Sequence, residues 1–217
     1  MLDYQKQFIQ YALDCGVLRF GEFKLKSGRT SPYFFNTGLF NTGEKLAKLG
    51  QFYAQTLIES KLQVDMLYGP AYKGIPLVSA ASIAYSQLKQ DIPYAFNRKE
   101  AKDHGEGGLI VGTQLQGKVL ILDDVITAGT SVRESVDIIN KAGARPAGVL
   151  IALDRQEKGE NDKSAVQEVS ERIGIPVISI ISLTQIIEFL ALSENSAKQL
   201  EIIKAYRLEY GLNSIRF

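Results

Sequence analysis

Runs of apolar residues alternate with helical patterns along most of the chain, and this alternation constrains the fold more than any other feature. A strand that is covered on both faces of a sheet reads as a continuous apolar run, as residues 119–122 do. Strands that alternate with helices indicate a parallel sheet with helices on its faces. The sequence therefore predicts an α/β fold with a mainly parallel central sheet flanked by helices. The expected strands are 64–68, 93–97, 118–122, 147–153 and 177–181.

The segments between these strands repeat apolar residues at the period of a helix, as Val132, Val136 and Ile139 do. Residues 20–35 predict short strands or an irregular cap, and the polar, glycine-rich segment 99–112 predicts a mobile loop. We expect a single domain over residues 1–217. The expected helices are 4–13, 44–60, 74–88, 131–141 and 164–173, and two more follow residue 183.

Composition and charge exclude several functional classes. The net charge is +1, which provides no bulk attraction to nucleic acid or to an anionic membrane. The one cysteine, Cys15, excludes an internal disulfide, and together with the one histidine, His104, it cannot form a Cys/His zinc cage. No stretch approaches the roughly 20 apolar residues of a membrane span, and residues 1–10 do not resemble a signal peptide. We therefore expect a soluble cytoplasmic protein that binds neither nucleic acid nor membrane.

The most informative segment is 119–131, where an apolar strand leads into two carboxylates and then into a turn of small and hydroxyl residues. In parallel sheets, ligands bind beyond the carboxyl ends of strands. Asp123 and Asp124 can accept hydrogen bonds there from sugar hydroxyls, or from water around a magnesium ion. Residues 127–131 leave backbone N–H groups open to an anion, and the following helix adds its positive dipole end. The segment predicts a site for a phosphorylated sugar.

Two local patterns allow other interpretations. Residues 131–134 match a capping box, so one alternative is that Ser131 only caps its helix. Residues 112–118 imitate the first seven positions of a nucleotide-binding P-loop, but Val119 stands where Ser or Thr is needed. A strand also follows this motif, where a P-loop requires a helix, so we reject an ATPase.

Three segments upstream of the acidic motif carry aromatic or cationic residues at expected turns. Residues 26–35 contain paired aromatics, which can stack on a flat heterocycle but are also common in packing. Residues 68–76 place Lys73 after a strand, where it can face a pyrophosphate or only solvent. Residues 98–108 carry cations on a glycine-rich segment, which suits a lid over a polyphosphate but also fits a mixed-charge exposed loop.

The segment 119–131 resembles the phosphoribosyl-pyrophosphate motif of the type I phosphoribosyltransferases in residue order and in its strand–turn–helix context. With the three upstream segments in the same order and spacing, the chain resembles the orotate phosphoribosyltransferase family from about Lys26 to Arg155. This resemblance implies the type I phosphoribosyltransferase fold with a small N-terminal hood. The hood is expected mainly in residues 1–60, with the C-terminal helices, and the core in about 61–182.

The resemblance also implies roles for individual residues. Phosphoribosyl pyrophosphate is expected to bind Lys26, Tyr72, Lys73, Arg98, Lys99, Lys102, His104, Asp123, Asp124, Val125, Ile126, Thr127, Ala128, Gly129, Thr130 and Ser131. Orotate is expected to bind Phe34, Phe35, Thr127 and Arg155. The guanidinium fork of Arg155 suits the carboxylate of orotate in a bidentate contact. Catalytic roles are expected for Lys102, Asp123 and Asp124.

The implied reaction joins orotate N1 to C1′ of the donor as pyrophosphate leaves, which gives orotidine 5′-monophosphate. Mg²⁺ is the expected cofactor, held mainly through substrate and water with no direct protein ligand. Lys73, Arg98 and Lys102 are expected to stabilise the departing pyrophosphate while a closed lid excludes water. The family is dimeric, with lid residues such as Lys99 and Lys102 in the neighbour's site, so we expect a homodimer with shared active sites.

Three other functions stay open at this point. The acidic motif identifies the ribose donor but not the acceptor, so a phosphoribosyltransferase for a purine or another pyrimidine is one alternative. A non-catalytic regulator that senses the donor is the second, although the lid cations are present. A ribose-phosphate pyrophosphokinase is the third, although no ATP site is recognisable. Burial of Asp123 and Asp124 in packing, far from any cavity shared with the turn after them, would overturn the assignment.

Overall fold

The computed structural model describes residues 1–25, 28–102, 108–127, 129–159 and 162–212, apart from the side chains of residues 101 and 102. A six-stranded sheet with strand order β5-β4-β3-β6-β7-β8 forms the centre of this part of the chain. All neighbouring pairs are parallel except β4 with β5. The predicted mainly parallel α/β sheet is therefore confirmed. Its strands are β3 (Met66–Gly69), β4 (Tyr94–Lys102), β5 (Gly108–Gly112), β6 (Lys118–Leu122), β7 (Arg145–Asp154) and β8 (Val177–Ser182).

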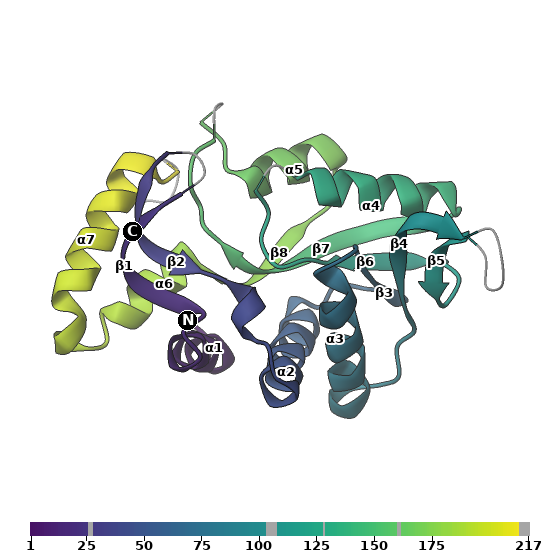
Figure 1. Cartoon of the computed structure of the whole chain (residues 1–217), viewed down its shortest axis with the longest axis horizontal. Helices are drawn as coiled ribbons and strands as arrows, with labels where there is room; N and C mark the ends of the chain where they lie inside the picture. The colour runs from purple at the N-terminus through teal and green to yellow at the C-terminus, as the bar shows by residue number, and fades with distance from the viewer. Residues whose placement is uncertain (26–27, 103–107, 128, 160–161, 213–217) are drawn as a thin grey trace.

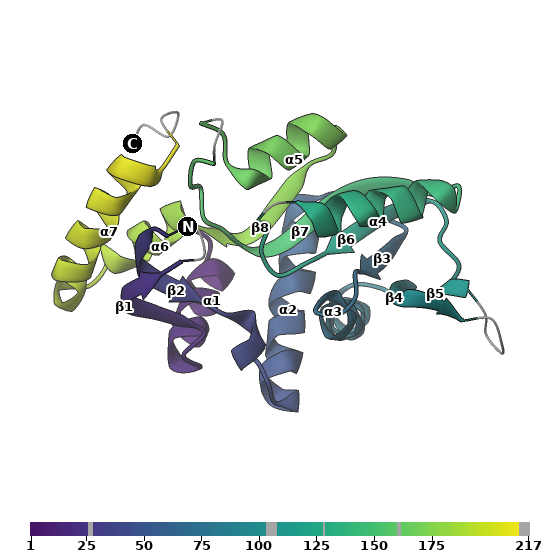
Figure 2. The ribbon, with the colours of Figure 1, turned by 45° about the horizontal axis from the view of Figure 1, so that its top comes forward.

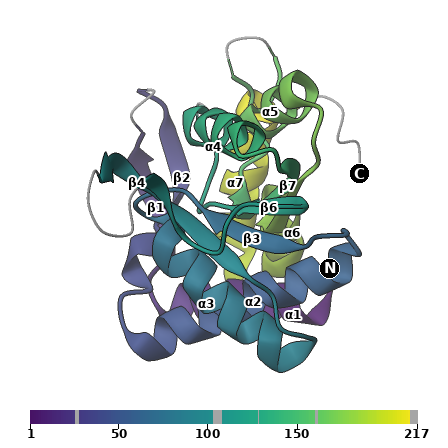
Figure 3. The same cartoon turned by 90° about the vertical axis from the view of Figure 1, so that its right-hand side faces the viewer.

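Helices cover both faces of the sheet (Figures 1 and 3). α4 (Thr130–Lys141) and α5 (Ala165–Ile173) lie on one face, and α2 (Gly43–Ser60) and α3 (Gly74–Leu88) lie on the other. In parallel sheets of this kind, each helix returns the chain to the end of the sheet where the strands begin. The carboxyl ends of β3, β6 and β7 therefore lie at the same end of the sheet.

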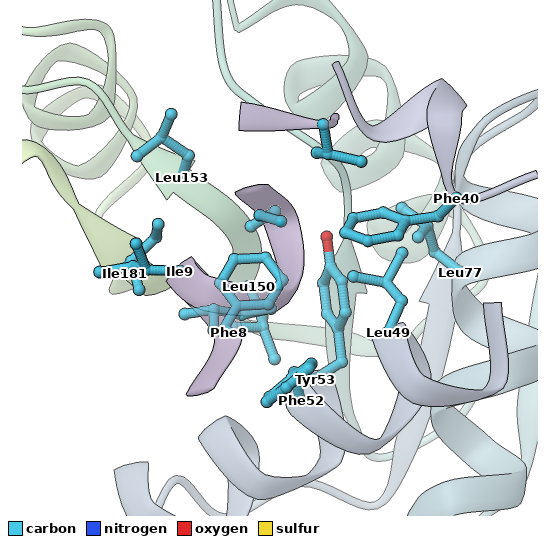
Figure 4. Close-up of a cluster of buried hydrophobic side chains, with 14 of the residues drawn as sticks. Phe8, Ile9, Phe40, Leu49, Phe52, Tyr53, Leu77, Leu150, Leu153 and Ile181 are labelled. Atoms are coloured by element: carbon cyan, nitrogen blue, oxygen red, sulfur yellow. The ribbon is translucent and has the colours of Figure 1, made fainter. Parts of the chain in front are cut away.

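The core residues of β6 alternate between the two faces. Leu120 and Leu122 pack in the hydrophobic cluster that includes α2 and α3, whereas Val119 and Ile121 pack in the cluster that includes α4. Successive side chains of a strand point to opposite faces, so burial on both sides requires an apolar residue at every position. Figure 4 shows the first cluster, in which the Tyr53 ring rises from α2 between Phe52 and Leu49.

A second, smaller unit, which we call the hood, lies beside the carboxyl ends of the sheet strands (Figures 1 and 2). Its hairpin pairs β1 (Leu18–Lys24) with β2 (Thr30–Phe35) in antiparallel fashion. Three helices complete the hood: α1 (Asp3–Asp14), α6 (Leu183–Leu190) and α7 (Ala197–Tyr210). α7 packs against β2, and α1 packs against α6. The two ends of the sequence therefore meet in one unit.

Helix α2 does not belong with the hood, where the sequence analysis placed it. It packs against α3 and against β7 and β8. Its apolar face supplies Leu49, Phe52 and Tyr53 to the core under the sheet. Residues 37–39 form a short 3-10 helix, η1 (Thr37–Leu39), which links the hood to α2, and η2 (Glu194–Ser196) precedes α7.

The expectation of a loop over residues 99–112 is wrong for most of that segment. β4 extends to Lys102, and Gly108–Gly112 forms β5, so the polar segment is an antiparallel hairpin arm at the edge of the sheet. Strand pairing is made by backbone groups and does not require apolar side chains, as the pairing of Lys102 with Gly108 shows. Residues 103–107 lie outside the described residues. None of the helices in the described part of the chain is long and apolar enough to cross a membrane.

The contact between α2 and α3 depends on a glycine. A Cβ atom at Gly50 would lie 2.5 Å from the Ala80 carbonyl oxygen, which is backbone and cannot rotate away. Gly50→Ala should lower the free energy of unfolding by about 1–3 kcal/mol, because overpacking outweighs the gain in helix propensity. Chemical denaturation measures this effect. Gly43→Ala in the same helix is the control, since no described atom lies within 4 Å of its Cβ position, and equal effects of the two changes would contradict the packing argument.

Candidate active site

The two predicted acids lie at the carboxyl end of β6, at the centre of the sheet. Asp123 is 8% exposed and Asp124 is 7% exposed, so both are more buried than a substrate-facing pair would suggest. Their surroundings are nevertheless polar. The backbone N–H of Asp124 donates to Asp123 Oδ1 at 2.9 Å, and the N–H of Val125 donates to Asp124 Oδ1 at 2.8 Å. Each acid therefore accepts a hydrogen bond from the residue that follows it, at the start of the turn.

The second oxygen of Asp124 connects three parts of the chain. Lys73 Nζ, which follows β3, donates to Asp124 Oδ2 at 2.6 Å. Thr37 Oγ1, from η1 beside the hood, donates to the same oxygen at 3.1 Å. The Lys73 side chain is 66% exposed, so its ammonium lies at the solvent edge of the site while the carboxylate lies below it. This arrangement places a positive charge and a negative charge together over the strand ends.

Asp123 is held from below by the core. The hydroxyl of the fully buried Tyr53 donates to the Asp123 carbonyl oxygen at 2.7 Å. Burial raises the pKa of the Asp123 carboxyl to about 6, and the charge of Asp124 adds to this shift, while hydrogen bonds from the Asp124 backbone and the Ser131 side chain oppose it. Asp123 thus changes between the protonated acid and the carboxylate close to neutral pH.

The turn after the acids gives α4 an open amino end. α4 begins at Thr130, and its N-cap is Gly129 in the left-handed region with φ 66° and no side-chain cap. A Cβ atom at Gly129 would also lie 2.5 Å from Val169 Cγ2, so only glycine fits there. Ser131 lies inside the helix and is not its cap, which removes the alternative interpretation of that residue. Among the described residues no N-cap side chain covers this amino end, and the N–H groups of a first helical turn suit an anion.

The turn that follows β3 is built from close backbone contacts. A Cβ atom at Gly69 would lie 2.2 Å from the Gly74 carbonyl oxygen, so this pair must be glycine. Asn97 Oδ1 of β4 accepts from the Tyr68 hydroxyl at 2.9 Å and from the Ala71 N–H at 3.0 Å, which supports the turn from the side. The Ala71–Tyr72 peptide bond is cis. The turn presents Tyr72, with 69% exposure, and Lys73 to solvent.

Three of the predicted lid cations, Arg98, Lys99 and Lys102, lie on β4. Lys99 Nζ lies 5.2 Å from the centre of the Tyr72 ring of the same chain, so the hairpin arm and the turn after β3 are neighbours. Arg98 Nη1 donates to the Gly108 carbonyl oxygen across the hairpin at 3.1 Å. The backbone of Lys102 pairs with Gly108, and its side chain is not described. The structure thus brings Lys99 to the Tyr72–Lys73 turn.

Arg155 follows β7 and faces the hood. Its guanidinium lies 4.2 Å from the centre of the Tyr33 ring, and Nη2 donates to Ser31 Oγ at 3.0 Å. Nε donates to Glu157 Oε1 at 2.9 Å, and Nη2 lies 2.6 Å from the same oxygen. Burial lowers the pKa of Arg155, but the charges of Tyr33 and Glu157 outweigh it and raise the pKa overall. Arg155 is therefore a fixed cation, and its Nε and Nη2 atoms have partners among the described residues.

The paired phenylalanines are both in packing contacts. Phe34 stacks on Phe23 with ring centres 5.4 Å apart, and the Arg19 guanidinium lies 5.5 Å from its ring centre. Phe35 meets the buried Phe8 edge to face at 6.3 Å. Both rings remain half-buried, so the packing interpretation of this pair holds for the ligand-free chain, and a contact with orotate stays a prediction.

Some predicted site residues are not described by the structure, and several residues that were not predicted contact the site residues. Lys26, His104 and Ala128 lie outside the described residues. Val125 and Ile126 are half-buried in the turn, while Thr127 and Thr130 are exposed at its mouth. The sequence analysis missed the partners that hold the site residues, which are Ser31, Tyr33, Thr37, Tyr53, Asn97 and Glu157. Among these partners, only Glu157 could have been suspected from the local sequence, because it is an acid two residues after the arginine at the end of a strand.

A cavity of about 750 Å³ lies apart from these acids, between the β1–β2 hairpin and α7. Its lining includes Phe20, Arg29, Ile202 and Tyr210, and it contains none of the predicted site residues. We therefore place the candidate site at the strand ends, where the charged groups converge, and not in this cavity.

Comparison with known proteins agrees with this geometry. The family model for the phosphoribosyl transferase domain matches residues 38–185, which span β6 with its acids and the turn after β3. A curated orotate phosphoribosyltransferase from Methylococcus capsulatus is 61% identical over 212 residues, covering 97% of this chain and 99% of that protein. One from Pseudomonas putida is 59% identical over 213 residues, covering 98% and 100%. The chain belongs to the orotate phosphoribosyltransferase family.

A solved structure supports this membership in three dimensions. The crystal structure of orotate phosphoribosyltransferase from Francisella tularensis matches 94% of this chain and 99% of its own, with a TM-score of 0.86 and 46% identity. For this member of the orotate phosphoribosyltransferase family, the hood and the sheet therefore belong to the shared fold. The expectation drawn from the acidic motif and its three upstream segments is confirmed at the level of the family.

The raised pKa of Asp123 predicts that its ionised carboxylate lowers the stability of the folded chain at neutral pH. Its folded-state pKa of about 6 lies above the ordinary value of 3.8, so the folded chain binds this proton more tightly than the unfolded chain does. The contribution of this carboxyl group to stability is then greatest below about pH 4 and is lost as the pH rises through about 6. Asp123→Asn should raise the free energy of unfolding at pH 7 by up to about 3 kcal/mol, at about 1.4 kcal/mol per pKa unit.

Thermal unfolding at pH 4 and pH 7 measures this effect, and the gain should shrink at the lower pH. Asp137→Asn, at an exposed position of α4, is the matched control and should change stability by less than about 0.5 kcal/mol. A destabilised Asp123→Asn variant at pH 7 would show that the carboxylate is a net stabilising group, which contradicts the burial argument.

Proposed function

We propose that this chain transfers the 5-phosphoribosyl group from phosphoribosyl pyrophosphate to orotate, giving orotidine 5′-monophosphate and pyrophosphate in pyrimidine biosynthesis. The observation that carries the proposal is the pair Asp123–Asp124 ahead of the amino end of α4, with the Lys73 ammonium on Asp124. Acids suit the ribose hydroxyls, and backbone N–H groups suit the 5′-phosphate. The relatives at 59–61% identity carry the same activity in their names, which supports orotate as the acceptor.

The charges of the site assign roles in this reaction. Positive charge develops on the ribose ring as the bond to pyrophosphate breaks, and Asp123 and Asp124 place carboxylates near it. Lys73, now on Asp124 Oδ2, can turn to the departing pyrophosphate, because 66% of its side chain is exposed. Arg98 and Lys102 of the hairpin arm would join it there, and Arg155 would bind the carboxylate of orotate. Orotate carries an ionisable ring nitrogen, so no strong protein base is required.

Magnesium fits this site through substrate and water. Within the described residues, no group of three or more His, Cys, Asp or Glu side chains could hold a metal ion. The oxygens of Asp123 and Asp124 are the hard ligands that Mg²⁺ prefers, and both can hold its waters. When bound, Mg²⁺ would neutralise the pyrophosphate of the donor. The remaining work of orientation and water exclusion falls to the residues of the chain.

We further propose a cytoplasmic homodimer with shared active sites. The hairpin of β4 and β5 lies at the end of the sheet away from the hood (Figure 1), which leaves it free to meet a second copy. A groove of about 300 Å³ between α2 and α3, lined largely by apolar residues with Ile83 60% exposed, offers surface for such a contact. Cys15 is a free thiol, which fits a reducing compartment. Sedimentation velocity tests the dimer.

The decisive experiment follows orotate absorbance after addition of phosphoribosyl pyrophosphate and magnesium, with pyrophosphate measured in parallel. Orotate should be consumed in equal amount to the pyrophosphate released, and chelation of the metal should stop both. Uracil, hypoxanthine and adenine should support far less turnover, because none of them carries the carboxylate that Arg155 is proposed to bind. Faster turnover with any of these bases would transfer the assignment to another phosphoribosyltransferase.

The proposed lid role of Lys102 gives a second test. Lys102→Ala should lower kcat by about two to three orders of magnitude, as loss of one preorganised charged donor commonly does, and should leave orotate binding nearly intact. Steady-state kinetics and equilibrium binding of orotate measure the two quantities. Lys204→Ala, at an exposed position of α7, is the control. Unchanged turnover in Lys102→Ala would remove the hairpin arm from the mechanism.

A further inference from the structure

Glu157 contacts the arginine of the proposed orotate site on one edge of its guanidinium group. A single oxygen, Oε1, accepts Nε at 2.9 Å and lies 2.6 Å from Nη2. The Tyr33 hydroxyl donates to the same oxygen at 3.3 Å. The side chains are 23% and 13% exposed for Arg155 and Glu157, so this ion pair is held largely away from water. An ion pair of this kind has a well-defined geometry, because water cannot easily replace either of its two charged groups.

Two further groups limit the remaining movement of Arg155. The Tyr33 ring, which is fully buried, supports the guanidinium plane from below at 4.2 Å. Ser31 Oγ accepts from Nη2 at 3.0 Å and donates to the Tyr33 carbonyl oxygen at 2.7 Å. Because the guanidinium group is planar, fixing one edge and one face also fixes the direction of the opposite edge. Nη1 is the nitrogen that neither Glu157 nor Ser31 occupies.

This geometry changes the expected contact with substrate. The sequence analysis expected Arg155 to hold a carboxylate with two nitrogens. Nε and Nη2 are already committed to Glu157 and Ser31, so a substrate carboxylate meets chiefly Nη1. The position of this one nitrogen then determines where the base lies relative to the ribose donor. An error of about 1 Å in such a contact is enough to reduce turnover strongly.

Glu157 is itself held by the C-terminal part of the chain. Its backbone forms an isolated antiparallel bridge with Gly211, directly after α7. The next residue, Lys158, donates its N–H to the Tyr210 carbonyl oxygen at 2.8 Å and accepts from Arg29 Nη1 at 2.9 Å. The segment after Arg155 is thus tied both to α7 and to the turn of the hood hairpin. The C-terminal helix gains a role in this way, as a support for the arginine at the strand end.

We propose that Glu157 is a positioning residue, which holds Arg155 through its Nε edge so that Nη1 faces the carboxylate of the acceptor base. The inference deepens the proposed function and rests on it. A competing interpretation makes Glu157 a rival of orotate, which must release Arg155 before the base binds. Contact at the Nε edge favours positioning, because a rival would be expected on the nitrogen that faces the substrate. The two interpretations predict opposite changes in orotate affinity when the charge of Glu157 is removed.

The test compares Glu157→Gln and Glu157→Ala with the wild-type chain. Glu157→Ala should raise KM for orotate by roughly 10- to 100-fold, and Glu157→Gln by only a few-fold, because the amide oxygen can still accept from Nε. KM for phosphoribosyl pyrophosphate should change by less than about twofold, and kcat less than KM for orotate. The preference for orotate over uracil should fall in parallel, since uracil has no carboxylate to lose. Glu201→Gln, at an exposed position of α7, is the matched control.

Three results would overturn the proposal. A lower KM for orotate in Glu157→Gln would show that Glu157 competes with the base. A rise in both KM values together with a lower melting temperature would show a purely structural role, and Glu157→Gln tests this even if Glu157→Ala does not fold. Wild-type kinetics in both variants would refute the inference alone. Absence of orotate turnover in the wild-type chain would instead refute the proposed function and, with it, this inference.

Discussion

The carboxylate of Asp124 is the contact on which the rest of the site depends. Its Oδ2 atom joins Lys73 from the turn after β3 and Thr37 from the segment beside the hood, while Oδ1 accepts the first N–H of its own turn. One side chain thus connects the end of β6, the turn after β3 and the segment between the hood and α2. Since Asp124 is 7% exposed, its charge needs these partners, and they in turn are kept in place by it.

A similar logic applies on the hood side of the sheet. Arg155 lies half-buried beside Tyr33, Ser31 and Glu157, all of which come from the hood or from the segment that α7 anchors. A buried cation without such partners would be costly, so the hairpin and α7 must be docked for the strand end to be folded correctly. The β7 end, which is part of the sheet core, therefore depends on both ends of the sequence.

The hairpin of β4 and β5 follows different rules. It lies at the sheet edge, and although Phe96 and Ile110 pack against the hydrophobic clusters, its outer part from Arg98 to Lys102 is polar, and the backbone pairing of that part is independent of side-chain burial. That independence explains why a segment read as a loop forms strands, and it suits a segment that carries cations toward a ligand. Lys99 over the Tyr72 ring joins this arm to the turn after β3, so the two proposed pyrophosphate-binding elements are adjacent before any ligand is present.

The local chemistry of the site can be predicted from neighbouring residues alone. The apolar run of β6, the two acids that end it and the glycine-bounded turns were all readable, because strand burial, turn formation and helix starts depend on neighbouring residues. The tertiary structure alone decided which residues hold that chemistry in place. Lys73 meets Asp124 across 51 positions, Thr37 across 87, and Ser31 meets Arg155 across 124. Such contacts leave no periodic trace in one sequence, since they arise only when packing of the hood against the sheet brings distant segments together.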